Sequence, residues 1–148
     1  MKASSLLLAG TLFVSAAHVP EAQAEPIHQQ VTRAALAHGV PPALAHGVVR
    51  VESNYRCHIR ASDGLSSGIM QVRPGTARSV GVRGNLNNCA SGLEAGMRYL
   101  RQALSAAHGD WCVAASLYNR GVGAGRRCTA YGRKVIRLSP SRRSSRAG

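Results

Sequence analysis

The chain has 148 residues, and 19 Lys and Arg against six Asp and Glu give it a formal net charge of +13. This length suits one domain with one core rather than several domains. The charge attracts polyanions, whether nucleic acid, anionic lipid or an acidic cell wall. Because carboxylates are so scarce, few residues can serve as a catalytic acid.

The first 24 residues have the features of a secretory signal peptide. Lys2 provides a positive start, residues 6–14 form a short apolar run, and Ala22 and Ala24 make an A-x-A cleavage signal. The apolar run is shorter than the roughly 20 residues that cross a bilayer. We therefore expect a cleaved leader and a mature protein that is periplasmic or secreted, without stable membrane insertion. Export makes nucleic acid the least favoured polyanion.

Helical signals dominate the chain that follows the leader. Apolar residues at helical spacing predict a helix over 26–37, and a second helix begins at a Pro-Pro pair and runs to Glu52. Turn residues then predict an irregular stretch, with a short extended segment or hairpin near 66–73. A short helix is expected over 74–79.

Capping residues place three further helices. Ser91 and Glu94 form the capping-box pattern S-x-x-E, which predicts a helix start at Ser91 with Glu94 used in the cap. Asp110 is the expected N-cap of the next helix, and Thr129 caps a last helix over 130–138.

Together these elements predict a small, mainly α domain over 25–138. Ser, Pro and Arg dominate residues 139–148, so we expect a basic, disordered tail there. The predicted core is rich in alanine, and at roughly 0.8 kcal/mol per buried CH₂ such a core gains less than one made of leucine. Cross-links would then matter for stability.

The cysteines predict such cross-links, because an even number in an exported chain indicates disulfides. A zinc site is the competing interpretation, but the chain has no C-x-x-C pair and no accompanying His-x-x-x-His. We therefore expect two disulfides and no metal. The cysteines are Cys57, Cys89, Cys112 and Cys128.

Glu52 follows an apolar helical run and precedes a turn. A carboxyl group there is expected half in the core and half at a cleft, and partial burial raises its pKa toward that of a general acid. An exposed glutamate at a helix end is the alternative from these residues alone. Two further polar pairs, Met70-Gln71 and Tyr118-Asn119, also follow apolar runs. Ends of elements that meet at one cleft are typical of a functional site.

These segments resemble the three signatures of the SLT-type (family 1) lytic transglycosylases, which read Glu-Ser, Gly-Leu-Met-Gln and Ala-Tyr-Asn-x-Gly. The resemblance covers nearly all of the predicted domain. It implies a lysozyme-like helical fold with a groove for glycan strands, and cleavage of the β-1,4 bond between N-acetylmuramic acid and N-acetylglucosamine in peptidoglycan. The matching segments here are Glu52-Ser53, Gly68-Ile69-Met70-Gln71 and Leu117-Tyr118-Asn119-Arg120-Gly121.

The resemblance assigns the acid and base role to Glu52. One carboxylate suffices in this family, because the sugar's own N-acetyl group stabilises C1 and its C6 hydroxyl closes a 1,6-anhydro ring without water. No cofactor is implied, and the histidines show no ligand spacing. The residues that the resemblance places around the substrate or the acid are Ser53, Met70, Gln71, Tyr118, Asn119 and Tyr131.

Two other functions remain open from the sequence. Asp63 lies on the loop before Gly68, where goose-type lysozymes of the same fold carry an aspartate that helps to position water. If Asp63 faces the cleft, the chain is a hydrolase of that type, whereas an Asp-Gly pair is otherwise a common turn, the interpretation that we favour. The second alternative is a non-catalytic, cationic protein that binds the cell wall.

The layout implied by the resemblance also favours the pairings Cys57–Cys89 and Cys112–Cys128. Cys89 and Cys112 fall at opposite ends of one helix, and a Cys57–Cys112 bond would have to span another, whereas disulfide Cα atoms lie within about 7 Å. The chain further resembles small members that open the wall for secretion or conjugation machines. Such a machine is therefore an expected partner besides peptidoglycan glycan strands, and we expect a monomer.

Overall fold

A computed structural model describes residues 24–140, so the predicted leader, apart from Ala24, and residues 141–148 of the predicted tail lie outside the described residues. Within this range the chain is mainly α, as predicted. No helix of the described part is both long enough and apolar enough to cross a membrane. The helices are α1 (Ile27–Ala37), α2 (Pro42–Glu52), α3 (Pro74–Ser79), α4 (Cys89–Ala106), α5 (Trp111–Arg120) and α6 (Ala130–Leu138).

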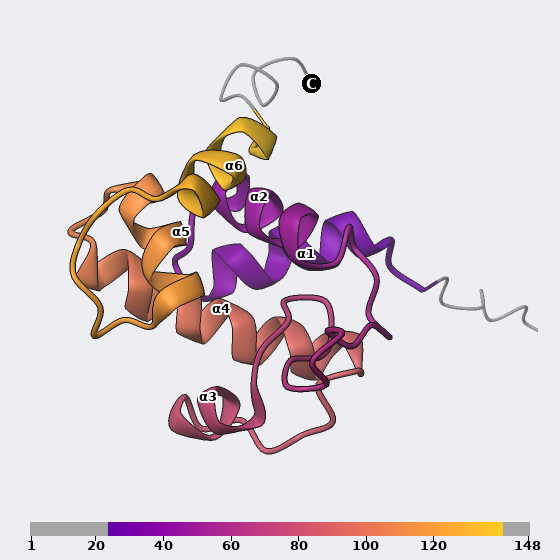
Figure 1. The fold of residues 1–148 in the computed structure, drawn as a ribbon. Helices are drawn as coiled ribbons and strands as arrows, with labels where there is room; N and C mark the ends of the chain where they lie inside the picture. The colour runs from indigo at the N-terminus through magenta and orange to yellow at the C-terminus, as the bar shows by residue number, and fades with distance from the viewer. Residues whose placement is uncertain (1–23, 141–148) are drawn as a thin grey trace, which may run out of the picture.

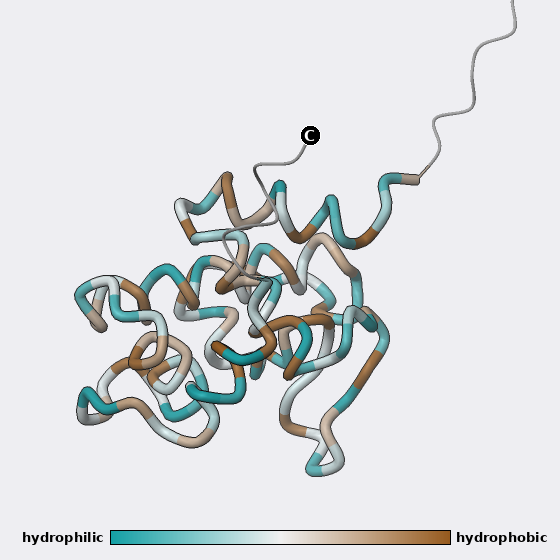
Figure 2. Tube along the Cα trace, turned by 90° about the horizontal axis from the view of Figure 1, so that it is seen from above, coloured by the Kyte–Doolittle hydropathy of each residue, from teal (hydrophilic) through white to brown (hydrophobic). Residues whose placement is uncertain are grey.

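Helix α4 crosses the middle of the molecule and packs against α1, α3 and α5, while α2 packs against α1 and α6 (Figure 1). Hydrophobic and hydrophilic residues alternate around the helical turns, as the amphipathic pattern of the sequence predicts (Figure 2). Leu44 and Val48 of α2, Met97 and Leu100 of α4, and Leu117 of α5 have no exposed surface. This shared core fixes the end of α2 relative to α4 and α5.

The segment between α2 and α3 has no regular strand. Two isolated antiparallel bridges, Arg60 with Ser67 and Ser67 with Val72, make the short hairpin-like structure that was expected near 66–73. Gly68 has a φ of +81°, and a Cβ there would collide with the carbonyl oxygen of Leu86. A glycine is therefore required where this segment passes the backbone that leads into α4.

Two of the predicted helix caps are confirmed. The side chain of Asp110 accepts a hydrogen bond from the backbone N–H of Val113 at 2.9 Å, and Thr129 Oγ1 accepts one from Gly132 at 3.5 Å. Each satisfies one of the backbone donors that a helix start leaves unpaired. The cap of Thr129 is relevant to function because it fixes where α6 begins.

The predicted capping box at Ser91 and Glu94 is wrong. Helix α4 begins earlier, with Asn88 as its N-cap, and the Asn88 side chain accepts a hydrogen bond from the Ser91 N–H at 3.2 Å. Asn and Ser are about equally good N-caps, so local preference did not separate them. Glu94 instead accepts a hydrogen bond from Nε of Arg98 at 2.7 Å, and its other carboxylate oxygen lies 2.8 Å from Nε2 of His38, which ties α4 to the end of α1.

The predicted disulfide pairings are confirmed. Cys57 bonds to Cys89 and Cys112 bonds to Cys128, and the Cα atoms are 5.1 Å apart in both pairs. The first disulfide anchors the segment after α2 to the start of α4. The second anchors the segment before α6 to the start of α5, so both cross-links hold elements that border the candidate site.

Candidate active site

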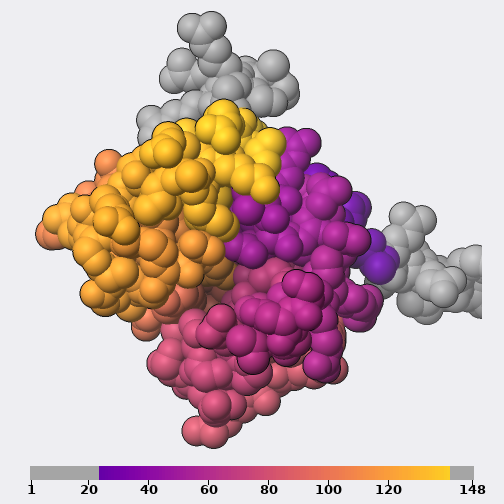
Figure 3. Space-filling view, viewed as in Figure 1, coloured from indigo at the N-terminus to yellow at the C-terminus, as the bar shows by residue number. Residues whose placement is uncertain are grey.

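A groove of about 480 Å³ opens where the end of α2, the hairpin segment and the end of α5 meet. The space-filling view shows it as a hollow between the orange surface of α5 and the magenta surface of the hairpin segment (Figure 3). Four of the predicted site residues line it. The lining residues are Glu52, Ala61, Ser66, Gln71, Val72, Arg73, Thr76, Tyr99, Tyr118, Asn119, Arg120 and Gly121.

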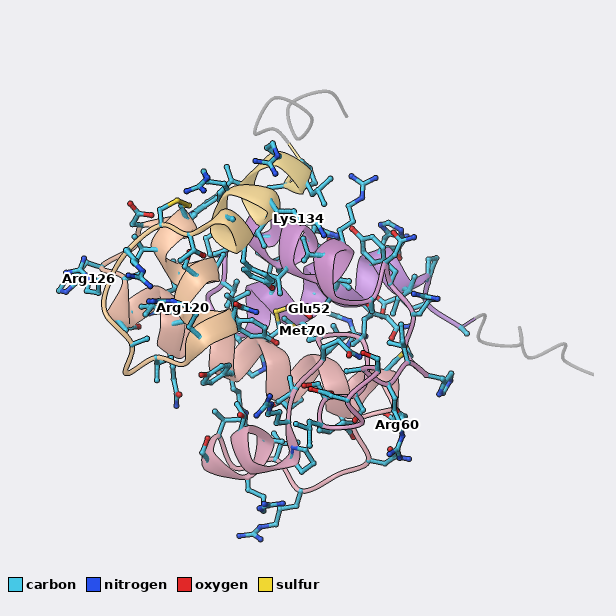
Figure 4. The ribbon with its side chains drawn as sticks, viewed as in Figure 1. Glu52, Arg60, Met70, Arg120, Arg126 and Lys134 are labelled. Atoms are coloured by element: carbon cyan, nitrogen blue, oxygen red, sulfur yellow. A yellow bond between two sulfur atoms is a disulfide. The ribbon has the colours of Figure 1, made fainter. Side chains whose placement is uncertain are left out.

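Glu52 is the last residue of α2 and lies at the centre of the view in Figure 4, with Met70 beside it and Lys134 on α6 above. Its side chain is half-buried, and burial raises the pKa of the Glu52 carboxyl above its ordinary value. A hydrogen bond from Tyr131 and the positive charge of Lys134 act in the opposite direction. The net effect is a carboxyl group that holds its proton to higher pH than a surface glutamate does.

Tyr131 supplies the hydrogen bond to this carboxyl, because its hydroxyl donates to Oε1 of Glu52. Burial, and then the charge of Glu52, raise the pKa of Tyr131 far above its ordinary value. The hydroxyl therefore keeps its proton and remains a donor. It lies on the first turn of α6, which the Thr129 cap sets in place.

Ser53 and Met70 are buried rather than open to the groove. Ser53 is 2% exposed, and its hydroxyl donates a hydrogen bond to the carbonyl oxygen of Ile69 at 2.7 Å. Met70 has no exposed surface, and its carbonyl oxygen accepts a hydrogen bond from the hydroxyl of Tyr118 at 2.7 Å. These contacts join the hairpin segment to the end of α2 on one side and to α5 on the other.

Gln71 and Asn119 do line the groove. The amide nitrogen of Gln71 donates hydrogen bonds to the carbonyl oxygens of Gly68, at 2.9 Å, and Ile59, at 3.1 Å. Its carbonyl oxygen Oε1 is therefore the atom left for a ligand. The positive φ of 49° at Gln71 turns the chain at this point, which places side chains of neighbouring residues in the core and in the groove.

Asp63 does not belong to the groove. Its Oδ1 accepts a hydrogen bond from the backbone N–H of Leu65 at 2.9 Å, in an exposed turn, and it is absent from the residues that line the pocket. This is the turn role that the Asp-Gly pair predicts. The geometry gives no support to a water-positioning role for Asp63.

The turn after Glu52 contains an arrangement that sequence reasoning missed. Asn54 and Tyr55 both have positive φ angles, 49° and 65°, which non-glycine residues rarely adopt. The hydroxyl of Tyr55 lies 2.8 Å from Nδ1 of His46, and its ring stacks on His28 with centroids 3.9 Å apart. His28 and His46 lie on α1 and α2, and through these contacts both histidines help to hold the turn that follows the acid.

Within residues 24–140, no group of three or more His, Cys, Asp or Glu side chains is placed to hold a metal ion. Sequence reasoning assigned no role to four further groove residues, Arg73, Thr76, Tyr99 and Arg120. Arg120 lies within the third motif and Arg73 follows the second closely, so their positions gave a signal. Thr76 on α3 and Tyr99 on α4 belong to no motif.

The family described as "Transglycosylase SLT domain" matches residues 29–136. The chain belongs to this family. The fold of the SLT domain is similar to the X-ray structure of an inactive mutant of the lytic transglycosylase Slt from Pseudomonas aeruginosa, with 24% sequence identity and a TM-score of 0.59. The match covers 74% of this chain and 20% of that protein, so the chain spans about a fifth of its length. In that mutant a glutamate is replaced by glutamine.

Proposed function

We propose that this SLT domain is a peptidoglycan lytic transglycosylase in which Glu52 acts as both acid and base. The observation that carries the proposal is the half-buried Glu52 carboxyl at the groove, with a raised pKa and a hydrogen bond from Tyr131. A raised pKa keeps a carboxyl group protonated closer to neutral pH, as a general acid requires. The inactive glutamine mutant of the Pseudomonas aeruginosa protein is consistent with this assignment.

In the proposed reaction, protonated Glu52 donates its proton to the oxygen between C1 of N-acetylmuramic acid and C4 of N-acetylglucosamine. The bond from C1 to that oxygen breaks, and the N-acetyl group of the muramyl residue stabilises C1. Glu52, now a carboxylate, takes the proton from the C6 hydroxyl of the same sugar while O6 bonds to C1. The product carries a 1,6-anhydro end, Glu52 regains its proton, and no water is consumed.

The groove supports a single-carboxylate mechanism over ordinary hydrolysis. Glycosidases use two carboxyl groups, about 5–5.5 Å apart when one is a nucleophile and about 6.5–9.5 Å apart when one activates water. Glu52 is the only carboxylate among the described residues that line the groove. Asp63, the one alternative that the sequence offered, is engaged in its own turn.

The other predicted site residues divide into two proposed roles. Gln71 and Asn119 line the groove and offer amide groups to the sugar, and Tyr118 adds a ring whose hydroxyl is held by Met70. Ser53, Met70 and Tyr131 position the acid or the hairpin segment, because they are buried or already bonded to it. This division assigns direct substrate contact to groove residues alone.

We also propose that the domain is exported and acts as a monomer on glycan strands in the periplasm or outside the cell. Two disulfides suit an oxidising compartment, and the predicted leader over 1–24 would direct export. A secretion or conjugation machine is a proposed partner, supported by the resemblance to small wall-opening enzymes.

The test compares the purified domain with its Glu52→Gln variant on purified peptidoglycan, using mass spectrometry of the released muropeptides. We expect anhydro ends from the wild type and none from the variant. Reducing ends, heavier by one water, would identify a hydrolase instead. Equal release by the two proteins would exclude both enzymatic functions and leave cell-wall binding, which the variant should retain.

A further inference from the structure

The groove contains two cations that the proposed reaction does not use. Arg73 and Arg120 are the only positively charged side chains among the described residues that line it. None of the ion pairs found within residues 24–140 includes either arginine. An unpaired guanidinium in a groove favours an anionic ligand, and its planar donors match a carboxylate.

Arg120 is held in place by the protein. Its Nη2 donates a hydrogen bond to the carbonyl oxygen of Gly125, on the connection between α5 and α6. Its Nε is buried and has no hydrogen-bond partner among the described residues, although buried polar atoms are normally paired. The guanidinium is therefore oriented and retains donor capacity that the described protein does not use.

Arg73 lines the same groove from a different element. It is exposed and precedes α3 as its N-cap residue, with no side-chain cap hydrogen bond. Figure 4 shows Arg120 on the α5 side of Glu52, whereas Lys134 lies on α6, on another side of Glu52. The two arginines thus line the groove that contains the acid, and they come from two elements, the end of α5 and the start of α3.

We infer that Arg73 and Arg120 form an anion-binding subsite for the carboxylates of the peptide stems that peptidoglycan carries on its muramyl residues. This inference rests on the proposed function and names the preferred form of its substrate. Each muramyl residue bears a lactyl group on O3 to which a peptide with free carboxylates is attached. A glycan strand seated against Glu52 brings such a stem to the groove wall, where a guanidinium pairs with its carboxylate.

The test measures kcat/KM on three forms of one peptidoglycan preparation. The first carries intact stems, the second has its stem carboxylates amidated to neutral groups of similar size, and the third is stripped of peptides by an amidase. We expect the wild type to prefer intact stems over both other forms by about tenfold, the effect of one charge-assisted hydrogen bond.

The variants Arg120→Gln and Arg73→Gln should each reduce this preference toward one. Arg137→Gln, which removes the same charge from an exposed position of α6 outside the groove, should keep it. Arg120 also contacts the α5–α6 connection, so thermal melts check that its variant folds, and the exposed Arg73 provides an independent readout. A wild type that does not distinguish intact from amidated stems overturns the inference, as does an unchanged preference in both variants.

A binding assay separates this inference from the proposed reaction. The affinity of Glu52→Gln for soluble strands with and without stems is compared with that of the double variants Glu52→Gln/Arg120→Gln and Glu52→Gln/Arg73→Gln. We expect the added arginine changes to remove the preference for stems without any turnover. Absence of anhydro products with a retained stem preference would refute only the reaction, whereas anhydro products without a stem preference would refute only the subsite.

Discussion

The hydroxyl of Tyr131 donates a hydrogen bond to Oε1 of Glu52 across a sequence separation of 79 residues. Burial raises the pKa of Glu52, and this hydrogen bond limits the rise because it favours the charged form. The proposed reaction needs both forms of Glu52, first the acid and then the carboxylate. By limiting the rise in the pKa of Glu52, Tyr131 therefore lets the same carboxyl group serve first as the acid and then as the base.

The variant Tyr131→Phe should raise the pKa of Glu52 further and lower kcat. The loss of a hydrogen bond to a charged group is about 1.5–3 kcal/mol, or roughly 10–100-fold in rate. In the pH profile of kcat/KM, the limb that reports loss of the Glu52 proton should move to higher pH. Tyr99→Phe, at another groove tyrosine, serves as the control, and an unmoved limb in Tyr131→Phe would show that the hydrogen bond does not tune the acid.

The same burial has a consequence for stability. A carboxyl group whose pKa is raised on folding binds its proton more tightly in the folded chain than in the unfolded chain, so the folded chain loses stability as pH rises through the interval between those pKa values. Above that interval the loss is complete. Glu52 is thus expected to destabilise the fold at neutral pH.

The variant Glu52→Gln should therefore melt higher than the wild type at neutral pH, by roughly 2–5 °C for a gain near 1 kcal/mol. Glutamine keeps an acceptor for Tyr131 and has no charge to desolvate. The gain should shrink as pH falls through the interval between the raised folded pKa and the unfolded pKa of the glutamate, and it should vanish below that interval. Melting curves recorded by circular dichroism from pH 3 to 8 test this, and a gain that does not vary with pH would contradict it.

Glu94 provides a comparison with the opposite sign. Burial alone raises the pKa of Glu94, but hydrogen bonds and charge from His38 and Arg98 lower it overall. A lowered pKa contributes stability above the unfolded value and loses it as pH falls through the folded value. Glu94→Gln should therefore destabilise at neutral pH, by a few tenths to about 1 kcal/mol because the pairs are partly exposed, and the loss should vanish in acid.

The sequence predicted those helix ends that depend only on residues close together in the chain. Asp110 and Thr129 cap their helices because a short acceptor side chain lies just before an apolar run. The start of α4 was not predictable in this way, since Asn88 and Ser91 are both good caps. In the structure, two long-range contacts hold this end of α4: the disulfide between Cys57 and Cys89, and the contact between His38 and Glu94.

The candidate site was predicted as a set of motifs but not as a surface. The spacing of the motifs indicated that Glu52, Gln71 and Asn119 share a cleft, and all three line the groove. It did not indicate that Ser53 and Met70 face inward, because burial depends on how the hairpin segment lies across α4. The motifs also could not predict the groove residues Thr76 and Tyr99, because these residues come from helices that carry no motif.

Gly96 shows how closely the hairpin segment approaches α4. A Cβ at Gly96 would lie 2.5 Å from the Cβ of Met70 and would also collide with its sulfur. Alanine in a helix is normally favoured over glycine by about 1 kcal/mol. Here we expect Gly96→Ala to destabilise instead, by about 1–3 kcal/mol, because the core is overpacked.

The displaced Met70 would also disturb the hydrogen bond from Tyr118 to its carbonyl oxygen, so activity should fall together with stability. Urea unfolding and release of muropeptides measure the two effects. Met70→Gly in the Gly96→Ala background removes the three side-chain atoms that collide, Cβ, Cγ and Sδ, and it should recover part of the activity if the collision is the cause. A stable and fully active Gly96→Ala would contradict the close packing.

The last prediction concerns the strained turn that follows Glu52. The positive φ angles of Asn54 and Tyr55 cost on the order of 1–3 kcal/mol each, and the hydrogen bond between Tyr55 and His46 helps to hold them. Tyr55→Phe removes that bond but keeps the ring that stacks on His28. We expect a stability loss of about 1 kcal/mol and a fall in kcat larger than any change in KM, because the end of α2 that carries the acid relaxes.

Thr32→Val is the control, because it removes the other hydrogen bond of His46, 2.9 Å long, without touching the turn. It should cost stability but not kcat, and an equal fall in kcat in both variants would show that the turn has no part in positioning Glu52.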